Sequence, residues 1–185
     1  MVAASLLPIG RLTVLERDPG RVAACRAAAT RLGRDVPVDV READVGTADA
    51  WPDAPDVVVA LHACGPAADL VLDRAAACGA RTVLVVPCCY GETVPFRVRA
   101  AAAIDNLGFV ADVVLRRRMT ASLVDLERKL RLEAAGYESE VEELIAPTVT
   151  PHNLLIVGRK TDSDVRIARA RDRLAALHAQ CTIRS

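Results

Sequence analysis

Three short apolar runs, separated by stretches of helical character, constrain the fold of this chain more than any other feature. The runs are Leu12–Glu16, Asp56–Ala63 and Thr82–Cys89, and each is rich in Val or Leu and bounded by polar residues or Gly. Short continuous apolar runs are typical of parallel strands that are buried on both faces. Val36–Val45 is a fourth, weaker candidate. The pattern therefore predicts a mostly parallel sheet.

The segments between these runs predict helices that connect one strand to the next. Pro19 opens a candidate helix that runs to about Leu32, and Pro66 opens another that ends near Gly79. Pro is favoured in the first turn of a helix and Gly just after its end. Strands and helices that alternate in this order favour right-handed crossovers. We therefore expect a doubly wound α/β domain of the Rossmann-like type.

The second half of the chain predicts a different arrangement. Its candidate elements are, in chain order, a helix, a short strand, a long amphipathic helix, two strands and a basic helix: Arg97–Asn106, Phe109–Leu115, Thr120–Ala135, Glu138–Ile145, Leu154–Val157 and Ser163–Ala179. A long helix followed by two strands close in sequence predicts an antiparallel pair at the sheet edge. The apolar face of the long helix is expected to consist of Leu123, Leu126, Leu130 and Ala134. We assign residues 1–160 to one domain and 161–185 to a C-terminal helix and tail.

Composition and charge narrow the class of protein. With 185 residues, 52% of them apolar, the chain is long enough for one domain with a hydrophobic core. The formal net charge is zero, which provides no overall field to attract nucleic acid. Charged residues within the first twenty positions exclude a secretory signal, and no apolar run approaches the ~20 residues of a membrane helix. We expect a cytoplasmic protein whose six cysteines are free thiols.

Two acids stand where the first strands end, which is where parallel sheets bind ligands. Glu16 ends the first run, and its carboxylate can accept hydrogen bonds from both hydroxyls of a ribose. Asp44 follows the weaker strand, and it can accept from an adenine amino group while the Val45 amide donates to the ring. The alternatives are a solvated acid at position 16 and, for Asp44, a turn residue that binds its own backbone. NAD and S-adenosylmethionine both contain adenosine, so both cofactors fit these roles.

The next two strand ends carry His62, Cys64, Cys88 and Cys89. His62 has the chemistry of a general base or of a donor that positions a substrate, although a core histidine bonded to backbone is the preferred interpretation. The thiols and the imidazole are also zinc ligands. Adjacent cysteines on one strand should point to opposite faces, so that one metal does not reach both without a bulge. We therefore expect buried thiols that pack under the site, and no metal.

The motifs His62-Ala63-Cys64-Gly65 and Cys88-Cys89-Tyr90, with the tail at 150–155, resemble a branch of class I S-adenosylmethionine-dependent methyltransferases. That branch includes tRNA acceptor-stem ribose methyltransferases and methyltransferase-like proteins, some with a glutathione S-transferase C-terminal-like domain. The resemblance spans about residues 10–160. It implies S-adenosylmethionine as cofactor and RNA or a small molecule as methyl acceptor. It also implies a catalytic, cofactor-contacting His62 and a substrate-side pocket made of Cys64, Gly65, Cys88, Cys89, Tyr90 and Asn153.

The chain departs from this family at its beginning. Class I methyltransferases hold the methionine part of the cofactor on a Gly-rich turn after their first strand, but none of the ten glycines here is spaced as GxG. Leu12–Glu16 would correspond to the second strand of the family, and Val2–Leu7 to the end of the preceding helix. The first strand would lie between Leu12–Glu16 and Asp56–Ala63. We thus expect a gap there, or low stability and self-association, and leave open whether this chain alone is active. A non-catalytic binding module and an NAD-dependent oxidoreductase remain alternative functions.

Overall fold

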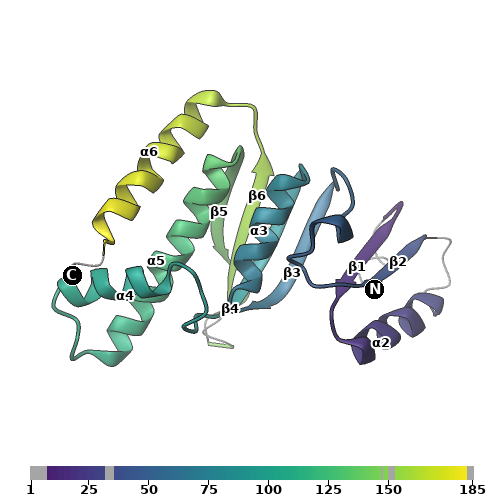
Figure 1. Cartoon of the computed structure of the whole chain (residues 1–185), viewed down its shortest axis with the longest axis horizontal. Helices are drawn as coiled ribbons and strands as arrows, with labels where there is room; N and C mark the ends of the chain where they lie inside the picture. Colours follow the sequence, from purple (N-terminus) through teal and green to yellow (C-terminus); the bar gives the residue numbers. More distant parts are fainter. Residues whose placement is uncertain (1–7, 32–35, 147, 150–152, 183–185) are drawn as a thin grey trace. The chain divides into compact units, whose positions relative to one another are not determined.

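The computed structural model describes residues 8–31, 36–146, 148–149 and 153–182. The chain divides into two compact units, Met1–Asp53 (unit 1) and Ala54–Ser185 (unit 2), each with its own sheet (Figure 1). Among the described residues, no helix is both long and apolar enough to span a bilayer. The expected helix end at Val2–Leu7 and the helix stop near Leu32 lie outside the described residues.

Unit 1 is a βαβ arrangement followed by a short 3₁₀ turn. Its elements are β1 (Leu12–Glu16), α2 (Pro19–Thr30), β2 (Val38–Glu42) and η1 (Ala48–Ala50). The strands are parallel, with Leu12 opposite Val38 and Glu16 opposite Glu42. The α2 helix starts as its sequence predicts, because the Asp18 carboxylate accepts a 2.8 Å hydrogen bond from the Arg21 amide and Pro19 occupies the first turn.

Unit 2 contains the motif-bearing strands and most of the helices. Its elements are β3 (Val57–Cys64), α3 (Ala67–Ala77), β4 (Thr82–Cys89), α4 (Arg97–Asn106), α5 (Val113–Ala134), β5 (Tyr137–Glu143), β6 (Leu154–Lys160) and α6 (Asp164–Gln180). The strand order is β3-β4-β6-β5, in which β3 and β4 are parallel and β6 is antiparallel to both of its neighbours. The mixed α/β architecture and the antiparallel last pair are therefore confirmed.

The strands β1 and β3 do not pair with each other. Within the described part of the chain, β1 pairs with β2 alone and β3 with β4 alone. Each of these strands belongs to a different sheet.

The helices α3 and α5 pack against one face of the unit 2 sheet, and α4 and α6 pack against α5 (Figure 1). Leu177 and Cys181, at the end of α6, share a buried cluster with Phe96, Val124 and Leu130. The C-terminal helix therefore contributes to the core of unit 2. The sequence pattern sets residues 161–185 apart from the domain as a helix and tail.

Gly158 marks the closest approach of α5 to the sheet. A Cβ atom at this position on β6 would lie 2.5 Å from Leu132 Cδ2 and 3.3 Å from Leu132 Cγ. Leu132 is itself buried, so its side chain has little room to move. We expect Gly158→Ala to lower the free energy of unfolding by about 1–3 kcal/mol in urea titrations, as overpacking does. Gly91→Ala is the control, since a Cβ there meets nothing within 4 Å; equal losses in both variants would contradict the packing argument.

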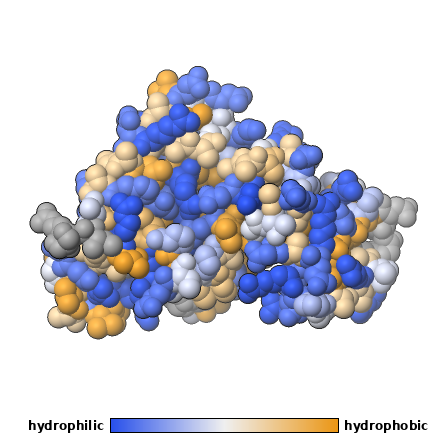
Figure 2. Space-filling view, viewed as in Figure 1, coloured by the Kyte–Doolittle hydropathy of each residue, from blue (hydrophilic) through white to orange (hydrophobic). Residues whose placement is uncertain are grey.

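The predicted short strand at Phe109–Leu115 is wrong, because α5 begins at Val113. Val110, Val113, Val114 and Leu115 are exposed, and within the described part of the chain this segment pairs with no strand. Figure 2 shows apolar surface at the lower left, over the region where α4 meets α5. We call this surface the α4–α5 patch; it consists of exposed Leu107, Val110, Val113, Val114 and Leu115.

The buried face of α5 also differs from its expected composition. Leu130 is buried as predicted, but Leu123 and Leu126 are only partly buried. The fully covered positions include the charged residues Asp125, Glu127 and Arg128. The helix therefore places ionic groups, and not only leucines, against the rest of unit 2.

Candidate functional site

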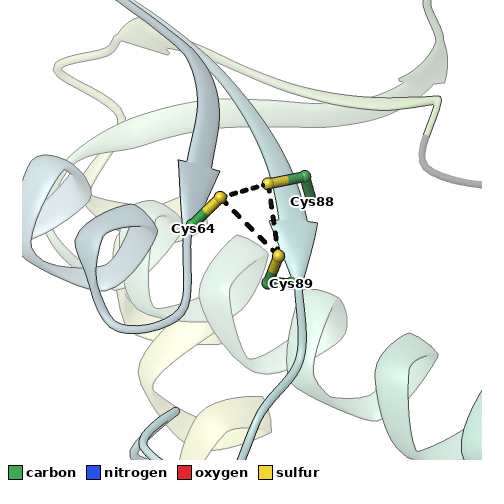
Figure 3. Close-up of side chains that lie close together, drawn as sticks. All are labelled: Cys64, Cys88 and Cys89. Atoms are coloured by element: carbon green, nitrogen blue, oxygen red, sulfur yellow. Dashed lines mark hydrogen bonds between the residues drawn. The ribbon is translucent and has the colours of Figure 1, made fainter.

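Three thiols converge where β3 and β4 end. Cys64 is the last residue of β3, and Cys88 and Cys89 are the last two residues of β4. The Sγ atoms of Cys64 and Cys88 lie 2.7 Å apart, and the Cys89 sulfur lies 3.6 Å from each of them (Figure 3). All six cysteines of the chain are free thiols in the structure.

Two irregularities in the strand pairing make this convergence feasible. Ala60 is opposite Val85, Ala63 is opposite Pro87 and Cys64 is opposite Cys89. The first shift leaves one extra residue on β3, and the second leaves Cys88 as an extra residue on β4. An extra residue breaks the alternation of side chains between the two faces of a strand. The expectation that neighbouring cysteines point to opposite faces is therefore wrong here.

The thiols are also more accessible than expected. Cys64 and Cys89 are exposed and Cys88 is half-buried, so they do not form the buried packing layer predicted from sequence. Burial, together with the neighbouring thiols Cys64 and Cys89, raises the pKa of Cys88 to about 12. This direction favours the neutral thiol form of Cys88, which lies in close contact with Cys64.

His62 lies on the irregular segment of β3. Its φ of 56° is in the left-handed region, which non-glycine residues seldom adopt. The side chain is exposed, so the preferred interpretation of a core histidine is wrong. The bulge between Ala60 and Ala63 explains the difference, because it turns this residue out of the regular alternation. Strained backbone of this kind often occurs at functional sites.

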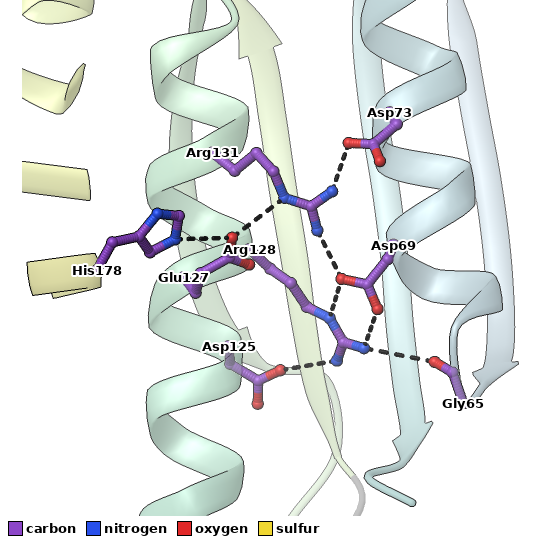
Figure 4. Close-up of polar contacts among 8 residues, drawn as sticks. All are labelled: Gly65, Asp69, Asp73, Asp125, Glu127, Arg128, Arg131 and His178. Carbon is purple, nitrogen blue, oxygen red and sulfur yellow. Dashed lines mark hydrogen bonds and ion pairs between the residues drawn. The ribbon is translucent and has the colours of Figure 1, made fainter. Parts of the chain in front are cut away.

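A buried ionic network fixes both motifs to α5. The Tyr90 hydroxyl donates a 2.6 Å hydrogen bond to Asp125 Oδ2. Arg128 Nη2 donates to the carbonyl of Gly65 at 3.4 Å, and the guanidinium carbon lies 5.6 Å from the Tyr90 ring centroid. Gly65 directly follows Cys64, and Tyr90 directly follows Cys89, so α5 holds the residue next to each group of cysteines. We call this arrangement the Arg128 network; Figure 4 draws Arg128 with its partners Gly65, Asp69 and Asp125.

Acidic side chains surround the fully buried guanidinium of Arg128. Asp69, on α3, accepts hydrogen bonds from Arg128 at 2.7 and 3.2 Å, and Asp125 accepts one at 3.3 Å. Arg131 joins Asp69 and Asp73 at 2.5 Å each. Burial raises the pKa of Asp125, while the hydrogen bond from Tyr90 and the charge of Arg128 oppose that rise. Burial, and then the Asp125 charge, raises the pKa of Tyr90 well above its ordinary value.

The sequence interpretation missed this network. Asp69 follows the first motif by four residues, and Asp125 and Arg128 lie three apart on α5. The available signal was charge on the apolar side of a helix, where Asp125 and Arg128 lie among Val124, Leu130 and Leu132. Because a buried charge requires a partner, such positions indicate an ion pair with another element.

In unit 1, Glu16 and Asp44 lie at the same end of their sheet, as predicted. The Ala43 amide donates to the Glu16 carbonyl at 3.0 Å, which places the two strand ends side by side. Glu16 Oε1 accepts from the Asp18 amide at 2.9 Å, and Asp44 Oδ1 accepts from the Gly46 amide at 2.8 Å. Asp44 therefore makes the local backbone contact that was considered as its alternative role, and Glu16 also accepts from a nearby backbone amide instead of being only solvated.

The remaining predicted site residues have local contacts of their own. The Val45 carbonyl accepts a 2.8 Å hydrogen bond from the Trp51 indole. Asn153 is buried, and its side-chain amide donates to the Ile145 carbonyl at 2.7 Å. Asn153 therefore joins the two ends of the connection between β5 and β6.

Comparison with known proteins relates the first half of this sequence to a described family. Residues 6–94 match the model of a family described as a methyltransferase domain. The match covers β1 to β4 and includes both cysteine motifs. Residues 6–94 are methyltransferase-like. The resemblance inferred from the two motifs is thereby confirmed.

Two curated relatives carry the name glutathione S-transferase C-terminal domain-containing protein homolog. The protein of Drosophila pseudoobscura pseudoobscura is 30% identical over 129 residues, which are 56% of this methyltransferase-like chain and 22% of the relative. The protein of Drosophila melanogaster is 30% identical over 124 residues, 54% of this chain and 21% of the relative. The chain thus spans about a fifth of the length of each. No solved structure gives a significant match.

Proposed function

We propose that this chain is a methyltransferase domain that uses S-adenosylmethionine, and that Glu16, Asp44 and Val45 bind the adenosine half of the cofactor. The observation that carries the proposal is the family match over residues 6–94, which contains all three residues. Supporting it, Glu16 ends β1 and Asp44 follows the end of the adjacent parallel strand β2, and ligands of such sheets bind beyond the carboxyl ends. The antiparallel pair of β5 and β6 favours this function over an NAD-dependent oxidoreductase.

The geometry of the two acids is compatible with this role. Glu16 Oε2 lies 3.9 Å from Arg21 Nη1, and Asp44 Oδ2 lies 3.7 Å from Arg17 Nη1, on arginines that are largely exposed. Ion pairs this long and exposed contribute little to stability. Ribose hydroxyls and an adenine amino group can therefore take their place at small cost.

We propose that the methyl acceptor binds at the ends of β3 and β4. The bound cofactor supplies the methyl group, and the protein aligns the acceptor and removes its proton. We propose the exposed His62 as the base; Gly65, three residues later in the sequence, and Tyr90, directly after β4, are held in place by the Arg128 network. RNA or a small molecule is the proposed acceptor. Arg117 and Arg118 are exposed and available to phosphates, whereas Arg116 is paired with Asp105 at 2.5 Å.

Saturation-transfer NMR with S-adenosylhomocysteine tests the adenosine assignment, because the method detects weak binding. We expect saturation of the adenine and ribose protons to exceed that of the homocysteine protons, since the sequence has no GxG turn to hold that end. Glu16→Gln should reduce the ribose signals about tenfold, the loss of one charge-assisted interaction of about 1.5 kcal/mol. Asp49→Asn, which removes an exposed acid of unit 1 outside the proposed site, is the matched control.

NAD serves as the comparison ligand. Saturation of its nicotinamide protons would favour an oxidoreductase and contradict the proposal. Absence of transfer to either ligand would exclude Glu16 and Asp44 as cofactor contacts. Equal effects of Glu16→Gln and Asp49→Asn would show that the signals come from non-specific electrostatic binding.

A further inference from the structure

The three thiols at the ends of β3 and β4 form a more specific arrangement than a substrate pocket requires. Among the described residues, Cys64, Cys88 and Cys89 are the group whose ligand atoms all lie within 4.8 Å of one another. They come from two strands, and Cys88 joins the group because of the bulge on β4. Bulges are local features that re-aim side chains, often near functional sites.

We propose that Cys64, Cys88 and Cys89 bind one thiophilic divalent cation, with zinc as the best fit. Zinc with tetrahedral geometry and Zn–S bonds of about 2.3 Å requires sulfurs about 3.8 Å apart. Two of the three separations, at 3.6 Å, already match this spacing. The third, 2.7 Å between Cys64 and Cys88, has to open by about 1 Å, which the exposed side chain of Cys64 can accommodate.

The three-sulfur arrangement favours a cation over a disulfide. A Cys64–Cys88 bond would require an oxidant and a separation of about 2.05 Å, and it would leave Cys89 without a role. A single cation accounts for all three sulfurs and for the bulge that gathers them. Deprotonated thiolates would otherwise repel one another, and a divalent cation compensates that repulsion.

The cation would keep an open coordination position. Structural zinc sites are closed by four protein ligands, whereas catalytic sites have three and leave the fourth to water or substrate. Here Cys64 and Cys89 are exposed, so solvent reaches the cluster. Gly65 and Tyr90, the neighbours of two of the ligands, are anchored by the Arg128 network, which holds the strand ends in position. This site lies within unit 2 and does not depend on the proposed cofactor contacts of unit 1.

Cobalt substitution provides a direct test. The reduced, tag-free full chain is freed of metal with a chelator and titrated with Co²⁺, which gives thiolate charge-transfer bands in the near ultraviolet and d–d bands typical of tetrahedral sites. We expect saturation at one Co²⁺ per chain, displacement by Zn²⁺, and protection of three of the six thiols from a thiol reagent once zinc is bound. Cys64→Ser, Cys88→Ser and Cys89→Ser should each weaken Co²⁺ binding about tenfold or more, because each removes a ligand.

Cys25→Ser is the matched control, because it removes a thiol outside the cluster and should leave the titration unchanged. Circular dichroism of every variant confirms that the fold is retained. Six thiols that stay reactive in the presence of zinc would overturn the proposal. So would charge-transfer bands that persist in Cys88→Ser, or a Cys64–Cys88 disulfide in the isolated protein, detected by peptide mass as the loss of two hydrogens.

Discussion

Arg128→Met is expected to lower the free energy of unfolding by about 3–5 kcal/mol, a large part of the stability of a domain of this size. The substitution keeps much of the side-chain volume but removes the guanidinium that Asp69 and Asp125 share. Asp69 keeps Arg131 as a partner, whereas Asp125 keeps the Tyr90 hydroxyl but has lost the cation of the network. A buried carboxylate without a cation is costly, which is why removal of one member of such a network is more damaging than replacement of all of it.

Urea titration at pH 7 measures this loss, with Arg159→Met as the control. Arg159 pairs with Glu140 at 3.7 Å, and both side chains are more than half exposed, so its removal should cost less than about 1 kcal/mol. The second variant is Arg128→Met with Asp125→Asn, which should recover part of the loss because no unpaired carboxylate remains at position 125. Equal stability of the wild type and Arg128→Met would contradict the network.

The pH dependence of the variant distinguishes lost charge pairing from lost packing. Arg128 lowers the pKa of Asp125, which burial raises. In Arg128→Met that pKa should rise further above its unfolded value of about 3.9, so the folded state binds the proton more tightly than the unfolded chain. A raised carboxyl pKa gives stability that is present at low pH and lost as the pH rises through the folded pKa. The variant should therefore recover stability relative to the wild type as the pH falls from 7 toward the unfolded value of about 3.9, and a pH-independent loss would indicate packing alone.

The isolated protein is expected to self-associate through β3. This strand is at the end of its sheet and pairs with β4 alone within the described residues. Its alternate side chains Val57, Val59 and Leu61 are 53%, 57% and 63% exposed. A long apolar strand with one unpaired edge is a template for pairing with another chain. Sedimentation velocity over a concentration series should therefore show dimers or larger species that form reversibly.

Val59→Lys should weaken this association about tenfold or more, because a charge on an edge strand opposes pairing; this change corresponds to about 1.4 kcal/mol. The control is Val113→Lys, which places the same charge in the α4–α5 patch at a residue that is 73% exposed. If both variants weaken the association equally, general apolar contact and not pairing through β3 would explain it. A protein that stays monomeric at all concentrations would contradict the prediction. Self-association that is weakened by Val113→Lys but not by Val59→Lys would also contradict it.

Local sequence patterns determined most of the elements of this protein. The predicted bounds Leu12–Glu16, Thr82–Cys89 and Arg97–Asn106 are the observed ones. A buried strand or a capped helix is specified by residues that are close in sequence, and these can be recognised without a partner. The same reasoning predicted that β5 and β6 pair, because an antiparallel pair needs only a short connection. It failed at Phe109–Leu115, where apolar residues lie on an exposed turn and helix.

Tertiary structure decided the details of the candidate site. The meeting of Cys64, Cys88 and Cys89 and the exposure of His62 depend on how β3 and β4 pair, and that register is a property of two strands together. The Arg128 network depends on the packing of α5 against α3, which joins residues 59 positions apart. Sequence alone determined which chemical groups this chain places at its strand ends, because strand ends are local features. Only the packed structure determined which of those groups touch, because register and helix packing arise from contacts that are distant in sequence.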